Sequence, residues 1–203
     1  MNPGKTIISR IRDKLGFYGK PFVGKNDLSR IVGPEGAGYG VRNLVQSGVI
    51  SVVRPGELYF NELSRTPKDP YVIGARYAAG ASPVFGGMST YNRRGLTTQV
   101  ANGYRVYNLA HSGRKTVLGV EFEFVKTTRP FLYGLERSMV KGERVALFDR
   151  ERALLEYVRE FRALPADFDR SAVDAPKLRA YAARYPIAAV ARKIFSHFPD
   201  ANP

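Results

Sequence analysis

The side chains best suited to chemistry in this sequence are ones that can read the edges of DNA bases. Arg, Asn and Gln can each make two hydrogen bonds to one base edge, and Arg42, Asn43 and Gln46 stand close together. In a helix over residues 35–48 they would share one face with Tyr39. The opposite, buried face would carry the apolar residues Ala37, Val41, Leu44 and Val45. This pattern predicts a recognition helix for the major groove, and a polar helix face in solvent is the alternative.

Three further residues are candidate DNA contacts near this helix. Lys25 and Ser29 belong to the start of a short helix predicted around residues 26–31, and helix N-termini favour anions such as phosphate. Arg54 stands in the turn 54–57 between two predicted strands, so it would reach the DNA from the tip of a hairpin. An exposed turn arginine without a DNA partner is the alternative for Arg54.

The elements around these residues follow the order of a winged helix-turn-helix. Apolar residues at offsets of three and four predict a first helix over residues 6–15, ended by Gly16. The pair of helices at 26–31 and 35–48 is broken by Gly33-Pro34, and strands at 49–53 and 58–60 follow. A helix, a tight break, a second helix and a hairpin place one helix in the major groove of double-stranded DNA. We therefore predict a winged helix domain over residues 1–65.

A second domain is predicted over residues 66–203, after the polar, proline-containing stretch 61–69. Its periodicity changes several times between helix and strand, so the fold class of the chain is α+β, with a mixed α/β C-terminal domain. The predicted helices cover residues 70–79, 85–96, 149–161, 176–185 and 187–198, with Asp149 as an N-cap. The predicted strands cover residues 99–101 and 104–109, which flank the hairpin signal Asn102-Gly103, and residues 117–127, 131–133 and 145–148.

The charge of the chain favours a polyanionic partner. Its 203 residues carry a formal net charge of +14, and its pI is about 10.1. Residues 1–65 hold ten Lys or Arg and five Asp or Glu, so most of the surplus lies outside the predicted DNA-binding domain. The basic pairs Arg93-Arg94 and Arg114-Lys115 are candidate phosphate contacts. The alternative is that they are surface residues that contact only solvent.

Enzyme motifs are largely missing from the sequence. The absence of cysteine excludes disulfides, thiolate metal sites and a cysteine nucleophile. Gly4-Lys5-Thr6 lacks the strand and glycines of a P-loop, and the two histidines, His111 and His197, lie far apart. We therefore expect no catalytic residue, cofactor or metal. The alternative is a Mg²⁺-dependent nuclease using Glu121 and Glu123 on one strand face with Lys126 nearby, although alternating charges on an exposed strand explain these residues equally well.

The sequence also predicts a cytoplasmic protein without a membrane partner. The first residues lead into a segment with Arg10, Arg12 and Lys14 instead of the apolar core of a secretory signal. No stretch approaches the roughly 18 apolar residues that a membrane helix needs.

Two segments of the second domain carry a family resemblance. They are GLTTQV at residues 95–100 and DRERALLEYV at residues 149–158. Preceded by a winged helix, this pattern resembles the AbiEi family of antitoxins and transcriptional regulators from abortive-infection toxin–antitoxin systems. The resemblance implies a prokaryotic protein encoded beside a nucleotidyltransferase-like toxin. It would repress its own promoter through the N-terminal domain and counteract the toxin through the C-terminal domain, without requiring a stable complex with it.

Two further expectations concern partners. A homodimer on repeated DNA half-sites is expected because one such domain buries limited surface on DNA. The alternative function is a stand-alone transcriptional regulator whose C-terminal domain binds a ligand or another protein.

Overall fold

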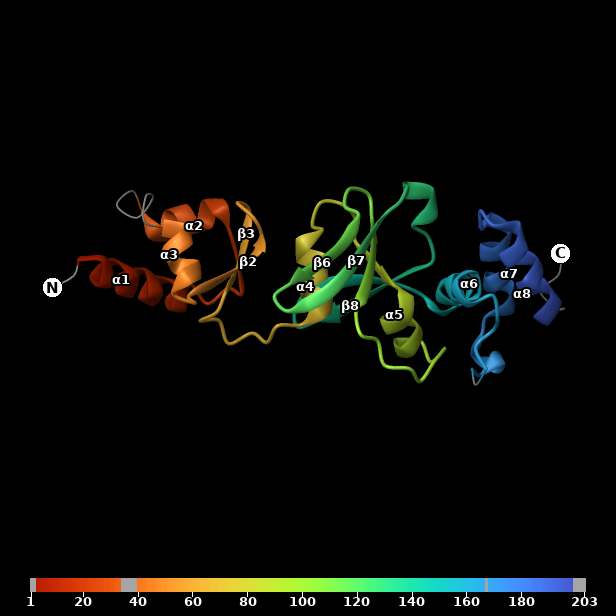
Figure 1. Cartoon of the computed structure of the whole chain (residues 1–203). Coiled ribbons are helices and arrows are strands. Elements are labelled where there is room, and N and C mark those ends of the chain that lie inside the picture. The colour runs from red at the N-terminus through yellow and green to blue at the C-terminus, as the bar shows by residue number, and fades with distance from the viewer. Residues whose placement is uncertain (1–2, 34–39, 167, 199–203) are drawn as a thin grey trace. The chain divides into compact units, whose positions relative to one another are not determined.

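The chain is described by a computed structural model that covers residues 3–33, 40–166 and 168–198. It contains two compact units, formed mainly by residues 1–69 and by residues 70–203 (Figure 1). Both units combine helices with a sheet, so the predicted α+β class is confirmed.

The described residues of the first unit form three helices and a small antiparallel sheet, and the helices are labelled in Figure 1. The helices are α1 (Pro3–Tyr18), α2 (Lys25–Val32) and α3 (Gly40–Gln46). The strands are β1 (Phe22–Gly24), β2 (Ile50–Arg54) and β3 (Leu58–Asn61), arranged in the order β1-β3-β2. The predicted hairpin over residues 49–60 is therefore present, and β1 adds a third strand beside β3.

The three helices and the sheet of the first unit share one apolar core. Leu15, Leu28 and Leu44 contribute one fully buried side chain from each helix. Val23 and Ile50 are equally buried on the strands.

The predicted end of the first helix at Gly16 is wrong. The helix α1 continues to Tyr18, and its chain reverses at Gly19, whose φ of +68° lies in the left-handed region that glycine tolerates. Asn61 fastens this corner to the sheet. Its buried side-chain amide donates to the carbonyl oxygens of Leu15 (3.0 Å) and Lys20 (3.2 Å).

The second unit is built on a six-stranded mixed sheet in the order β6-β7-β5-β4-β9-β8. Its strands are β4 (Val84–Gly86), β5 (Tyr104–Asn108), β6 (Gly113–Val117), β7 (Val120–Lys126), β8 (Leu135–Val140) and β9 (Glu143–Phe148). The pairs β4–β9 and β5–β7 are parallel, whereas β4–β5 and β8–β9 are antiparallel.

Five α-helices of the described residues accompany this sheet. They are α4 (Pro70–Tyr77), α5 (Gly87–Arg93), α6 (Arg150–Phe161), α7 (Ala175–Arg184) and α8 (Ala188–His197). Tyr107 and Phe148 of the sheet share a buried cluster with Leu154 of α6, Leu178 of α7 and Ile194 of α8. The helix α6 thus lies between the sheet and the C-terminal pair of helices, and Asp149 caps it by accepting a hydrogen bond from the Arg152 backbone N–H (2.9 Å), as predicted.

Two predicted elements in the middle of the second unit are wrong. Residues 85–96 do not form one helix, because Val84–Gly86 is a central strand paired with both β5 and β9 before α5 begins. Residues 99–101 do not pair with β5 in a hairpin, because β4 and β7 occupy both edges of β5. The side-chain amide of Asn92 instead holds this segment by donating to the carbonyl oxygens of Thr97 (3.2 Å) and Gln99 (3.3 Å).

The predicted strands at 117–127 and 131–133 also differ from the structure. A turn at Leu118 and Gly119, with φ of 52° and 80°, divides the first segment and creates the additional strand β6. The second segment overlaps a 3₁₀ turn at Arg129–Phe131, in which Pro130 cannot donate to a strand ladder. The strand β8, which follows it, was not predicted.

Candidate functional site

The helix α3 presents polar side chains opposite its buried stripe. Leu44 is buried, whereas Arg42 and Gln46 are exposed and Asn43 is half-buried. Val41 was expected in the core, but its exposed fraction is 39%. The buried residues of this seven-residue helix are Gly40 and Leu44.

Two of the predicted residues of this helix segment, Tyr39 and Ala37, lie outside the residues that the structure describes. Val45 is half-buried against the core. The exposed polar surface of α3 is therefore formed by Arg42 and Gln46 with part of Asn43.

The start of α2 and the β2–β3 turn lie side by side. The Lys25 backbone N–H donates to the carbonyl oxygen of Glu57 (2.9 Å), so two of the predicted phosphate-contacting regions are joined. Lys25 and Ser29 are both exposed, and the Ser29 hydroxyl donates to the Lys25 carbonyl oxygen (2.9 Å). The side chain of Arg30 was not predicted as a contact, although it is 82% exposed one residue further along the helix.

Arg54 at the end of β2 is less free than its position in a turn indicates. Its guanidinium is ion-paired with Glu57 across the turn (2.7 Å), and only 26% of its side chain is exposed. A phosphate at this turn would have to share Arg54 with that carboxylate. A β-turn brings residues i and i+3 close together, so the spacing of the two residues in the sequence is enough to predict this ion pair.

One arginine of the two basic pairs in the second unit is bonded to other residues of the protein, and the other three cations are exposed. The Arg94 guanidinium donates to the Phe148 carbonyl oxygen (2.9 Å) and to Glu136 (2.8 Å), and its side chain is only 14% exposed. Arg94 therefore ties α5 to the sheet. Arg93 is exposed beside the Tyr71 ring, and Arg114 and Lys115 are exposed on the edge strand β6.

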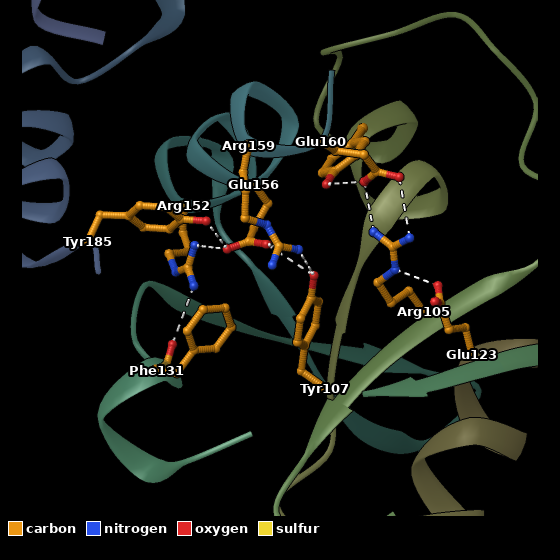
Figure 2. A network of polar contacts seen from close by, with 10 residues as sticks. Arg105, Tyr107, Glu123, Phe131, Arg152, Glu156, Arg159, Glu160 and Tyr185 are labelled. Carbon is orange, nitrogen blue, oxygen red and sulfur yellow. Dashed lines mark hydrogen bonds and ion pairs between the residues drawn. The ribbon is translucent and has the colours of Figure 1, made fainter. Parts of the chain in front are cut away.

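A buried polar network lies between α6 and the sheet, and sequence patterns did not reveal it. Arg152 and Glu156 are ion-paired with no side-chain exposure at all, and Arg159 also reaches Glu156 (2.7 Å). The hydroxyls of Tyr107 and Tyr185 donate to the same carboxylate at 3.1 and 2.8 Å (Figure 2). The Glu156 carboxylate therefore accepts hydrogen bonds from a residue of β5, from residues of α6 itself and from the residue that ends α7.

Four aromatic rings enclose the Arg152 guanidinium. Their centroids lie 4.4 to 4.9 Å from its central carbon, and the rings belong to Phe131, Tyr133, Phe148 and Tyr185. A cation over aromatic faces is stabilised by their quadrupoles, most strongly where water is excluded. Arg152 and Glu156 of the DRERALLEYV segment are thus part of the core. The i, i+4 spacing of Arg152 and Glu156 indicates an ion pair along a helix, but it does not reveal that the pair is buried.

Burial and the Glu156 carboxylate raise the pKa values of two tyrosines in the network. Burial is the main cause that raises the pKa of Tyr107, and the negative charge of Glu156 raises it further. The pKa of Tyr185 is raised by the same two causes. Both hydroxyls therefore remain protonated hydrogen-bond donors well into the alkaline range.

We expect this network to make the protein sensitive to alkali. A tyrosine whose pKa is raised in the folded state adds stability that is present below about pH 10 and is lost as the pH rises further. Above pH 10, each such tyrosine should lower the free energy of unfolding by about 1.4 kcal/mol per pH unit. Urea titrations at several alkaline pH values should therefore show a shallower pH slope for Tyr107→Phe. An unchanged slope would contradict the role given to Tyr107.

The structure does not gather the acidic residues of the nuclease alternative into a metal site. Glu123 is ion-paired with Arg105 (2.6 Å), and no group of three His, Asp or Glu side chains suited to a metal ion is found among the described residues. None of the described helices is long and apolar enough to cross a membrane.

Comparison with solved structures finds a likeness in fold. No protein-family model matches the chain, and a search of curated proteins finds no significant match. The fold is similar to that in the crystal structure of the RV2827C protein from Mycobacterium tuberculosis, with a TM-score of 0.53 and 16% sequence identity. The similarity covers 94% of this chain and 71% of that chain.

Proposed function

We propose that the first unit is a winged helix-turn-helix domain that binds double-stranded DNA, with α3 in the major groove. The observation that carries this proposal is the exposure of Arg42 and Gln46 on a short helix whose other side is fixed in the core by Leu44. Arginine and glutamine in such a position can make paired hydrogen bonds to guanine and adenine. The helix is followed directly by the β2–β3 hairpin, which would serve as the wing.

Phosphate contacts would fix the register of this helix on the duplex. The exposed cations Lys25 and Arg30 on α2 are suited to that task, and Ser29 lies between them. Dimerisation on repeated half-sites would supply the remaining specificity, because one small domain reads only a few base pairs.

We further propose that the protein is an antitoxin that represses its own operon and counteracts a nucleotidyltransferase-like toxin. This proposal rests on the resemblance of residues 95–100 and 149–158 to AbiEi antitoxins. Co-expression with the product of the neighbouring gene tests it: growth should be restored by the whole chain if that product is such a toxin. A neighbouring gene of another kind would instead favour a stand-alone regulator, which the pocket described below supports.

Two substitutions separate the backbone contacts of the proposed interface from base reading. Lys25→Ala should weaken binding to every duplex equally and reduce the salt dependence of binding, because one fewer counterion is released from the DNA. Arg54→Ala should act in the same direction. Fluorescence anisotropy on operator and scrambled duplexes at several salt concentrations measures both effects.

Arg137→Ala is the matched control for these two variants, since it removes an exposed arginine from the edge strand β8 of the second unit. Its affinity for DNA should equal that of the wild type. Loss of affinity for the operator alone in Lys25→Ala would contradict a backbone contact.

A further inference from the structure

A pocket of about 450 Å³ opens on the second unit, near the edge strand β6 of its sheet. It is lined by the start of α5, by residues leading into β5, by β6 and β7 and by Glu160 of α6. Its volume lies in the range of small-molecule sites, which is roughly 300–1,000 Å³. All of its lining residues belong to the second unit, so it does not depend on the proposed DNA interface.

A fixed charge cluster forms the inner wall of this pocket. The Arg105 guanidinium bonds to Glu123 (2.6 Å) and to Glu160 at 2.7 and 3.3 Å (Figure 2). Tyr91 in turn donates to Glu160 (3.1 Å). One cation is therefore shared between two carboxylates, and the inner wall carries an excess of acceptor oxygens.

The outer wall carries charges that the described residues leave unpaired. Arg114 and Lys115 on β6 and Glu121 on β7 line the pocket and are exposed, and none of them forms an ion pair with a described residue. Two glycines line the same space without side chains. A Cβ atom at Gly87 would lie 3.0 Å from Cβ of Arg105, and one at Gly103 would lie 3.3 Å from the Glu121 carbonyl oxygen.

We propose that this pocket binds a small organic phosphate with adjacent hydroxyl groups, of the ribose phosphate kind found in nucleotides. Arg114 supplies an exposed guanidinium that can bond a phosphate, and Lys115 adds positive charge on the same strand. Glu121 supplies a carboxylate that accepts hydrogen bonds from neighbouring sugar hydroxyls, as acidic residues do for ribose in dinucleotide sites. Such a ligand satisfies both signs of charge in the pocket, whereas inorganic phosphate satisfies only one.

Calorimetric titration of the whole chain tests this assignment with four probes: ribose 5-phosphate, adenosine monophosphate, 2-deoxyribose 5-phosphate and inorganic phosphate. Ribose 5-phosphate should bind at least roughly tenfold more tightly than its deoxy analogue and inorganic phosphate, which is the factor for one charge-assisted hydrogen bond. Binding of adenosine monophosphate as well would identify the ligand as a nucleotide, and failure of it alone would identify a free sugar phosphate.

Substitutions connect that binding to the pocket. Arg114→Ala with Lys115→Ala should weaken ribose 5-phosphate binding by at least roughly tenfold. Glu121→Ala, which removes the acceptor oxygens, should abolish the preference for ribose over deoxyribose. The control is Arg137→Ala with Lys141→Ala, which removes the same charge from exposed positions elsewhere in the unit. Equal weakening in the control, no binding of any probe, or binding of single-stranded RNA without binding of the small probes would overturn the proposal.

Discussion

Replacing Glu156 with alanine should destabilise the second unit by about 3–5 kcal/mol. The substitution leaves Arg152 charged, fully buried and without its carboxylate partner. It also removes the acceptor of the Tyr107 and Tyr185 hydroxyls. Urea unfolding followed by far-ultraviolet circular dichroism measures the loss in the transition of the second unit.

Two further variants distinguish the buried charge from charge in general. Glu143→Gln removes the partner of Arg76 in a half-exposed ion pair, and its effect should stay below about 1 kcal/mol. Arg152→Met combined with Glu156→Leu removes both buried charges, and much of the stability lost in Glu156→Ala should return. A loss in Glu156→Ala no larger than that in Glu143→Gln would show that the network does not hold the unit together.

Replacing Arg42 with alanine should reduce affinity for the operator by about 1–3 kcal/mol and leave affinity for a scrambled duplex almost unchanged. A side chain that makes paired hydrogen bonds to one base edge contributes discrimination of this size. Asn43→Ala should act in the same way, because its exposed part shares the surface of α3 with Arg42. Competition binding with the two duplexes at one salt concentration gives both affinities.

The effects of Arg42→Ala and Lys25→Ala should differ in kind. Loss of a base contact relaxes sequence preference, whereas loss of a phosphate contact weakens binding to all sequences. If Arg42→Ala and Asn43→Ala weaken both duplexes equally, α3 does not read bases and its polar side chains contact only the DNA backbone.

The elements of the first unit follow from local signals in the sequence. Periodic apolar residues give α1, and short runs of β-branched and aromatic residues give β2 and β3. The misplaced end of α1 came from Gly16, because glycine ends a helix only where the backbone turns left-handed. That turn occurs at Gly19.

The second unit was harder to predict because its strands pair with distant residues. Val84–Gly86 becomes a central strand only because β5 and β9 lie on either side of it. The Asn102-Gly103 signal fails for the same reason, since β5 is already paired on both edges. The local propensity of a segment does not show which distant strands compete to pair with it.

The candidate sites also differ in how far they could be predicted from the sequence. The exposed side of α3 could be inferred from helical spacing, whereas the pocket around Arg105 depends on three strands and two helices meeting. The role of Arg152 could not be inferred either, because the four aromatic rings around it come from three segments that are distant in sequence. Charges at helical spacing are usually solvated, and only tertiary packing reveals the exceptions.

The most direct test of the proposed function is the binding of the whole chain to its own upstream DNA, compared with a scrambled duplex of equal composition at two salt concentrations. The proposal predicts tight binding to the upstream DNA, at least roughly a thousandfold tighter than to the scrambled duplex, with affinity that falls as salt increases. Weak binding that is equal on both duplexes would contradict a sequence-reading winged helix.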